Sequence, residues 1–385
     1  MRYLLSVVGA LLAVCLFGAT SHAQSSPPDP CLPGDPYELA ALAALLTSPT
    51  PPSAPVVINA DLTVAFVDSG MMTDDDDIMG RGPALTGPAE PEERPVESVR
   101  LDAVPVRIFN TRTQFEWRVT MSEQMLRAIY TCHAAGGRTE AGGPLDAGVI
   151  EGQTLLYLPA ILVQEGNALS VTHTLQDTGS AVAPAGWSGG DDTRIIRTPT
   201  TLWPWRTLTQ SSSWPNGEQS RCTMTLIGPR HLITAAHCLV NFGTSNWKAR
   251  KLTPARNGIN TNPYGVSQMT PNPPPGADAW YIVPDPWLDP NTPNDENKYQ
   301  WDIGLVLMLD RLGDQTGWMG YGAYPASDLN TRYHLNRGYP GCNSSYTERP
   351  QNCQVARLYG DTKECKIGYY HNQGSNGWNR EYTIG

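Results

Sequence analysis

The chain has 385 residues, of which 40% are hydrophobic and 17% are charged, and its formal net charge is −10. This composition supports a large core and excludes a chain that is disordered throughout. Residues 24–186 hold 8 basic and 21 acidic residues, a net charge of −13, whereas residues 187–385 hold 18 and 16, a net of +2. An acidic first half and a second half without a basic stripe argue against nucleic acid as a partner.

Residues 1–23 have the three parts of a secretory signal peptide. Arg2 supplies the positive region, Leu4–Leu16 are mostly apolar, and Ser21–Ala23 form a small-x-small cleavage signal. The alternative is a membrane anchor, but a spanning helix needs about 20 apolar residues and this run is shorter. We therefore expect a secreted protein, extracellular or periplasmic, with no membrane contact after signal removal.

Residues 24–100 are rich in proline and acidic residues, a composition that resists packing into a core. Most of this stretch is predicted to be mobile. The run Asp74–Asp77 could suggest a calcium site, but consecutive aspartates lack the alternate spacing of a calcium loop. We interpret the run as part of a solvated tether.

A small folded α+β part is predicted at about residues 96–177, so that this half of the chain is partly disordered. The segment Val99–Ile108 has a strand-like pattern, and Thr120 with Glu123 can form the capping box of a helix. Gly136–Gly137 would end that helix. A break rich in glycine, proline and alanine then separates this half from the second.

The stretch CTMTLIGPRHLITAAHC, residues 222–238, predicts a β-hairpin that ends on a histidine. Cys222 and Cys238 flank the hairpin, and in an oxidising compartment a disulfide closing such a loop contributes ~3 kcal/mol. Ala235 and Ala236 are small enough for a tight turn before His237. A catalytic imidazole has to be held in one orientation and tautomer, which a rigid hairpin and a buried carboxylate can provide.

The run Ile233–Cys238 resembles the histidine motif of chymotrypsin-like (trypsin-like) serine proteases at every position. The resemblance implies an all-β fold with a double six-stranded β-barrel, and it implies that His237 is the general base. The alternative is a buried structural histidine without a catalytic role.

The stretch QWDIGLVLML, residues 300–309, resembles the aspartate motif of the same family. Asp302 stands at the head of an apolar strand, and the resemblance implies that it orients the imidazole. Gly304 departs from the motif, in which alanine is more usual. Without the family, a lone acidic residue here would be a solvating residue at the edge of a strand.

The stretch GGDDTRIIRTPTTLWPWRTL, residues 189–208, resembles the start of the glutamyl endopeptidase branch of this family. That branch is bacterial and secreted with a removable propeptide. The resemblance implies a protease domain at 187–385, a propeptide at 24–186 and cleavage of substrates after glutamate. Our hypothesis is that the acidic propeptide covers the active-site cleft until cleavage near residue 187. The alternative for residues 24–186 is an accessory domain that stays attached.

The nucleophilic serine is not evident in the sequence. The chemistry requires a tight Gly-x-Ser-Gly turn, and no such turn follows Asp302. Ser375 is the nearest candidate, but it lacks the glycine two positions before it, and we interpret it as a surface turn residue. The segment 379–385 resembles the strand that leads into the nucleophile loop, so the serine is expected after Gly385 and the second barrel is expected to be incomplete.

The cysteine count also predicts an incomplete chain. Seven cysteines remain after removal of the signal peptide, which is an odd number. Cys31 and Cys132 can pair within the propeptide. The pairing of the last three stays open, and one of them would wait for a partner beyond residue 385; they are Cys342, Cys353 and Cys365.

These patterns predict a secreted serine endopeptidase, made as a zymogen, that hydrolyses protein or peptide substrates with a His-Asp-Ser triad and needs no metal or cofactor. A first alternative is a catalytically inactive protease-like binding protein, because 10 of the 11 tryptophans lie in residues 187–385 and could form a recognition surface. A second is a zinc protein using His231, His237 and Cys238. The six-residue spacing of the histidines and the use of Cys238 in a disulfide argue against it.

Overall fold

A computed structural model describes residues 36–68, 72, 105–125, 194–213, 220–270, 278–294, 298, 301–320, 333–334, 337–342, 352–361, 365–373 and 379–384. Several sequence predictions fall outside these ranges: the signal peptide, the run of four aspartates, Cys31, Cys132, the cleavage region near residue 187, and Ser375. Within the described ranges, every helix is too short or too polar to cross a bilayer.

Strands dominate the described residues, and the predicted all-β fold class is confirmed. In chain order the elements are α2 (Pro36–Thr47), β1 (Val56–Val57), β2 (Leu62–Val67), β3 (Val106–Asn110), β4 (Glu116–Met121), β5 (Arg194–Ile196), η2 (Trp205–Thr207), β6 (Leu208–Ser213), β7 (Ser220–Leu226), β8 (His231–Thr234), η3 (Ala236–Cys238), β9 (Arg250–Pro254), β10 (Ser267–Met269), β11 (Ala279–Pro284), α5 (Asp285–Leu288), β12 (Gly304–Met308), α6 (Gly313–Thr316), β13 (Tyr333–His334), β14 (Arg337–Gly338), β15 (Tyr359–Asp361), β16 (Cys365–Gln373) and β17 (Asn379–Ile384).

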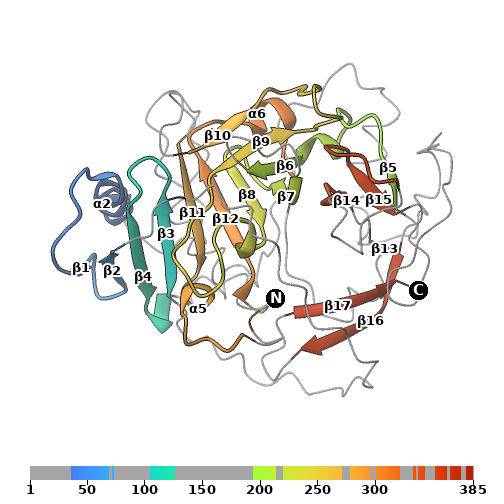
Figure 1. The fold of residues 1–385 in the computed structure, drawn as a ribbon. Helices are drawn as coiled ribbons and strands as arrows, with labels where there is room; N and C mark the ends of the chain where they lie inside the picture. The colour runs from blue at the N-terminus through green and yellow to red at the C-terminus, as the bar shows by residue number, and fades with distance from the viewer. Residues whose placement is uncertain are drawn as a thin grey trace.

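Eleven strands form one antiparallel sheet, in the order β1-β2-β4-β3-β11-β12-β8-β7-β6-β9-β10 (Figure 1). The remaining strands form two three-stranded sheets, β13-β16-β17 and β14-β15-β5, on the other side of the molecule. The strand β5 belongs with the C-terminal strands because Ile195 pairs with Gly360. The chain therefore passes from β4 of the large sheet into the second set at β5, returns to the large sheet at β6, and leaves it again after β12.

The large sheet contains strands from both sides of the predicted boundary at residue 186. The strands β1 to β4 come from residues 56–121, and β6 to β12 come from residues 208–308. The join is the antiparallel pair β3 and β11, in which Ile108 lies opposite Ile282. The large sheet is thus wider than the six-stranded barrel that the family resemblance implied.

Folded structure begins earlier in the chain than predicted, because α2, β1 and β2 lie in the stretch expected to be mobile. Twelve of the thirteen prolines in residues 24–100 lie outside these elements, and the thirteenth, Pro36, is the first residue of α2. Leu42 and Leu46 are one helical turn apart in α2 and are 1% and 2% exposed. In β2, Leu62 and Val64 point to the same buried face. The average composition of residues 24–100 did not reveal these short apolar segments.

The predicted capping box at Thr120 is wrong in its position. Thr120 lies within β4, opposite Thr63 of β2. Helical structure begins at residue 123, and the Oγ of Ser122 accepts a hydrogen bond of 3.1 Å from the backbone N–H of Met125. Ser122 therefore has the position of the helix N-cap, two residues later than predicted.

We expect Leu42→Ala to lower the free energy of unfolding by about 2–5 kcal/mol, because it leaves a cavity in a packed core. Thermal and denaturant unfolding followed by circular dichroism would measure this change. Ala44→Ser, at an exposed position of the same helix, is the matched control and should have little effect. Equal stability of the two variants would mean that α2 does not belong to the folded core.

Candidate active site

His237 lies in η3, a single turn that directly follows β8. The turn is closed by the backbone N–H of Cys238, which donates to the carbonyl of Ala235 at 3.1 Å. Ala236 is fully buried, so a larger side chain would not fit at this position. The small residues before the histidine therefore allow the tight turn that the sequence predicted.

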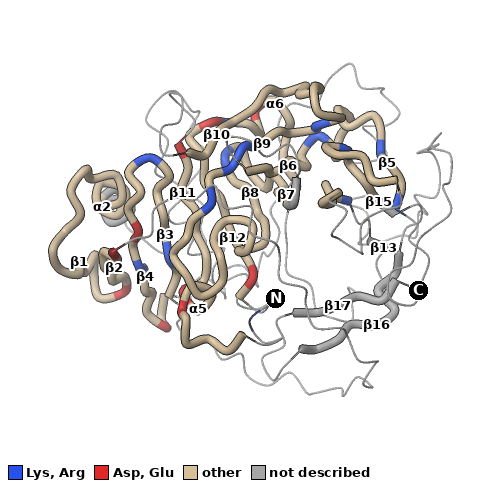
Figure 2. The backbone as a smooth tube through the Cα atoms, viewed as in Figure 1, with Lys and Arg blue, Asp and Glu red and all other residues tan. Residues whose placement is uncertain are grey.

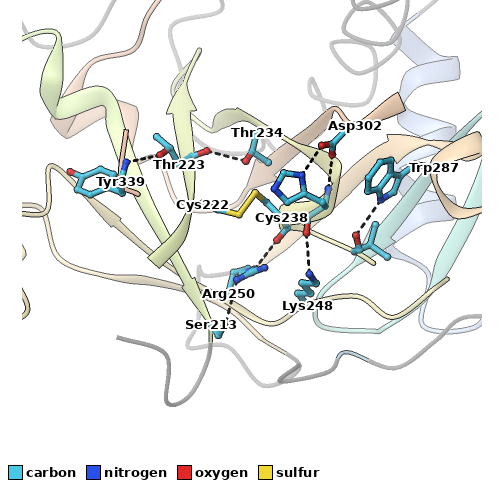
Figure 3. The surroundings of a disulfide bond; sticks show 12 residues. Ser213, Cys222, Thr223, Thr234, Cys238, Lys248, Arg250, Trp287, Asp302 and Tyr339 are labelled. Carbon is cyan, nitrogen blue, oxygen red and sulfur yellow. Dashed lines mark hydrogen bonds and ion pairs between the residues drawn. A yellow bond between two sulfur atoms is a disulfide. The ribbon is translucent and has the colours of Figure 1, made fainter. Parts of the chain in front are cut away.

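Asp302 binds His237 at two atoms. The Nδ1 of the ring lies 2.6 Å from Oδ2, and the backbone N–H of His237 donates to Oδ1 at 2.8 Å (Figure 3). A carboxylate that accepts from Nδ1 fixes the tautomer, because the proton then sits on Nδ1 and the Nε2 lone pair stays available. The Asp302 side chain is 12% exposed and that of His237 is 30% exposed, so the ring can be reached from solvent.

The sheet brings these two residues together across 65 positions of sequence. Asp302 stands two positions before β12, and His237 stands three positions after the end of β8. The strands β8 and β12 are antiparallel neighbours, with Gly304 opposite Thr234. Adjacent antiparallel strands place the end of one beside the start of the other. The backbone pairing therefore sets the distance between carboxylate and imidazole.

The predicted disulfide between Cys222 and Cys238 is confirmed, with the two Cα atoms 6.0 Å apart (Figure 3). It ties the residue after His237 to β7. The Oγ1 of Thr234 also donates to the carbonyl of Thr223 at 3.0 Å, which adds a second link across the hairpin. A further disulfide joins Cys342 to Cys353, and the side chain of Cys365 lies outside the described residues.

The hairpin also contacts the C-terminal strands. The backbone N–H of Tyr339, next to β14, donates to the Oγ1 of Thr223 at 2.8 Å. A Cβ on Gly338 would lie 2.9 Å from the same Oγ1, so this close approach needs a glycine. The histidine hairpin, which is part of the large sheet, is therefore also tied to the sheet that contains β14.

Two buried cations that sequence reasoning missed hold the backbone of the histidine turn. The Nζ of Lys248 donates to the carbonyl of His237 at 3.1 Å, and the Nε of Arg250 donates to the carbonyl of Cys238 at 2.7 Å (Figure 3). Their exposed fractions are only 7% and 4%. Charged donors make the stronger class of hydrogen bond. Nothing in the local sequence distinguishes them from surface cations.

The side chain of Leu239 explains why position 304 is glycine, where the aspartate motif that this segment resembles usually has alanine. A Cβ at this position would lie 2.7 Å from Cδ1 of Leu239, which directly follows η3. Alanine would fit only if the Leu239 side chain moved. The glycine and Leu239 are therefore matched at the back of the histidine turn.

No protein-family model matches the chain. A glutamyl endopeptidase of Bacillus licheniformis is 28% identical over 160 residues, which cover 41% of this chain and 44% of that protein. An extracellular metalloprotease of Bacillus subtilis is 26% identical over 212 residues, covering 48% and 62%. The chain resembles the glutamyl endopeptidase branch of the chymotrypsin-like serine proteases.

The chain spans less than two thirds of the length of either curated relative. Among solved structures, a Glu endopeptidase is similar at 18% identity and a TM-score of 0.33, over 50% of this chain and 90% of that one. The protease Anisep from Arthrobacter nicotinovorans is similar at 16% identity and a TM-score of 0.30, over 50% and 81%.

The triad predicted from the sequence also includes a nucleophilic serine. Ser375, the nearest sequence candidate, lies outside the described residues. The other three serines that follow Asp302 in the sequence also lie outside them: Ser327, Ser344 and Ser345. The described part of the site is therefore the imidazole, the carboxylate and the groups that hold them.

The structure disfavours the zinc alternative, because Cys238 is part of a disulfide and offers no free thiolate. One ligand atom from each of Cys222, His237 and Cys238 lies within 4.8 Å of the others, but the two sulfurs are bonded to each other. A disulfide sulfur is not the thiolate that zinc requires.

His231 is at the start of β8, and its Nε2 is buried without a hydrogen-bond partner. Burial first, and then the neighbouring charge of Arg230, lower the pKa of His231 to about 4.

We expect Arg250→Met to lower the free energy of unfolding by about 1–3 kcal/mol, because the buried carbonyl of Cys238 loses its donor. Arg250→Lys is the matched variant, since it keeps a charged donor on a shorter reach, and it should lose less. Denaturant unfolding of the wild type and both variants measures the difference. A methionine variant as stable as the wild type would show that this hydrogen bond does not stabilise the turn.

The low pKa of His231 predicts acid sensitivity. An unfolded histidine binds a proton below about pH 6.5, whereas folded His231 stays neutral down to about pH 4. The unfolded state therefore binds more protons in this window, and stability falls as pH is lowered through it. His231→Phe removes this contribution, so its stability relative to the wild type should rise between about pH 6.5 and pH 4. Parallel pH profiles in denaturant unfolding would contradict the assignment.

Proposed function

We propose that the chain is a serine endopeptidase of the trypsin-like type that acts on proteins or peptides. The observation that carries the proposal is the contact of 2.6 Å between the Nδ1 of His237 and the carboxylate of Asp302. The hydrogen bond from the His237 backbone to the same carboxylate, and the similarity to a glutamyl endopeptidase, support it. His237 is proposed as the general base and Asp302 as the residue that orients it.

In the proposed mechanism, the Nε2 of His237 removes the proton of a serine hydroxyl as its oxygen attacks the scissile carbonyl. Asp302 stabilises the imidazolium, which then donates the proton to the leaving amine and leaves an acyl-enzyme. A water molecule, deprotonated by the same imidazole, hydrolyses the ester and restores the serine. The triad needs no metal in this reaction.

The proposal also assigns roles to residues 1–186, in secretion and in zymogen inhibition. Residues 1–23 are proposed to direct secretion, to an extracellular or periplasmic location, and residues 24–186 to act as the propeptide of a zymogen cleaved near residue 187. The propeptide would inhibit the protease until that cleavage. Cleavage of substrates after glutamate is proposed only because a similar protein is a glutamyl endopeptidase.

A catalytically inactive, protease-like binding protein is the second candidate, because no Gly-x-Ser-Gly turn follows Asp302 in the sequence. A fluorophosphonate probe, which labels an activated serine, separates the two candidates. Labelling of the secreted protein that is lost in His237→Ala supports the enzyme. A secreted protein that stays unlabelled would favour the binding protein.

For the enzyme, we expect Asp302→Asn to lower kcat on a peptide substrate by on the order of 10⁴-fold, because the amide no longer favours the Nδ1–H tautomer. His237→Ala should abolish turnover. Both variants should keep the circular dichroism spectrum of the wild type, which separates lost chemistry from lost folding. Turnover retained by a folded Asp302→Asn protein would exclude the proposed role of the carboxylate.

A further inference from the structure

The N-terminal layer, defined as α2 and β1 to β4, forms one side of the molecule beside β11 (Figure 1). Its strand β3 pairs with β11 over five positions, from Val106 opposite Pro284 to Asn110 opposite Trp280. Two backbone hydrogen bonds extend the pairing: Asp285 donates to Pro105 at 2.8 Å and Thr111 donates to Ala279 at 2.9 Å. Without the layer, this edge of β11 would present unpaired backbone groups, which proteins ordinarily cover.

The apolar contacts of the layer form one core with the protease region. Ile108, Trp117 and Val119 of the layer are at most 2% exposed and belong to one buried cluster. From the protease region this cluster includes Ile282, Leu305 and Leu307. An interface that resembles a domain core cut in half is typical of permanent complexes rather than transient ones.

Phe109 extends from the layer into the core behind the histidine turn. It is fully buried, and its ring stacks on Trp247 with centroids 4.7 Å apart and planes 8° from parallel. Tyr281 packs against the same two rings, and its hydroxyl donates to the carbonyl of Lys248 at 3.1 Å. Lys248 is the residue that holds the His237 carbonyl, so the layer supports the region that positions the imidazole.

Buried charges also cross this boundary. Arg107 pairs with both Glu116 of the layer and Asp285 of the protease region, and Arg118 pairs with Asp285 at 2.9 Å. Trp247 donates its Nε1–H to Glu116 at 2.9 Å. Figure 2 shows basic positions along β3 and β4 on the side of the sheet near α5, which carries an acidic position. Separation of the two parts would break these ion pairs and return their charges to water, so the pairs fix how the layer fits while the shared core and strand ladder supply most of the stability.

We infer that the N-terminal layer stays bound to the protease region after the chain is cut between residues 121 and 194, so that the processed protein contains two polypeptides. This inference rests on the proposed zymogen processing for its biological occurrence. In the sheet, β11 and β12 lie between β3 and β8, the strand that leads to His237. The layer therefore acts as a permanent support for the site, and inhibition of the zymogen falls to other residues of the proposed propeptide.

The experiment introduces a recognition site for an exogenous, sequence-specific protease near residue 187 of the full chain. After complete cutting, native size-exclusion chromatography at micromolar concentration should elute both fragments in one peak, and denaturant should separate them. Two separate peaks under native conditions would overturn the inference. Because the cut is made by an added protease, the result does not depend on peptidase activity, which the fluorophosphonate probe tests separately.

Two variants outside the layer test which contacts hold it, and neither of these two alters the layer itself. Asp285→Ala removes the partner of both arginines, and Trp247→Phe removes the hydrogen bond to Glu116 while keeping an aromatic ring. We expect each to raise the dissociation constant of the cut protein at least tenfold. Thr63→Ala, at an exposed position of β2, is the matched control and should leave it unchanged.

Folding of each variant is checked on the uncut chain by circular dichroism, and Arg118→Ala provides a milder alternative if Asp285→Ala does not fold, because Arg118 is half-exposed. Fragments of the Asp285 or Arg118 variant that are retained as tightly as those of the Thr63 control would contradict the role of the charges. Fragments of the unaltered protein that fall apart on cutting would contradict the inference as a whole.

Discussion

The double contact between Asp302 and His237 is the constraint on which the rest of the site depends. One carboxylate oxygen accepts from the ring and the other from the backbone N–H of the same residue. Such an arrangement fixes both the tautomer of the imidazole and the position of its Cα, because a ring rotation or a backbone shift would each break a bond. The backbone pairing of β8 with β12 places the two residues close enough for both hydrogen bonds.

A disulfide, two buried cations and a leucine side chain restrict the movement of the histidine turn. The disulfide holds Cys238 to β7, Lys248 and Arg250 bind the two carbonyls of the turn, and Leu239 packs against the Cα of Gly304. A general base works best when its orientation is set in advance, so that no reorganisation is needed during reaction. Two buried cations, Lys248 and Arg250, therefore stabilise the backbone of this turn, at positions where apolar side chains would ordinarily pack.

The continuous sheet changes how the N-terminal half is understood. A segment that only covered a site would meet the rest of the chain through a surface, whereas β3 continues the hydrogen-bonded ladder of β11 and places Phe109 in the same core as Trp247 and Tyr281. The fully buried Glu116 illustrates the cost of this design: burial raises the pKa of its carboxyl group, and the bonds from Trp247 and Arg107 offset part of that effect. Such a charge is tolerated only while its partners stay in place.

The sequence by itself determined the features that are local or carried by a motif. The hairpin, its disulfide, the tight turn before His237 and the strand after Asp302 all follow from patterns within about twenty residues. Tertiary structure alone decided which surfaces meet. Lys248 and Arg250 look like surface cations in sequence, and the pairing of β3 with β11 joins segments about 170 residues apart. Strand pairing and burial depend on the partner that the fold supplies, and a local pattern contains no information about that partner.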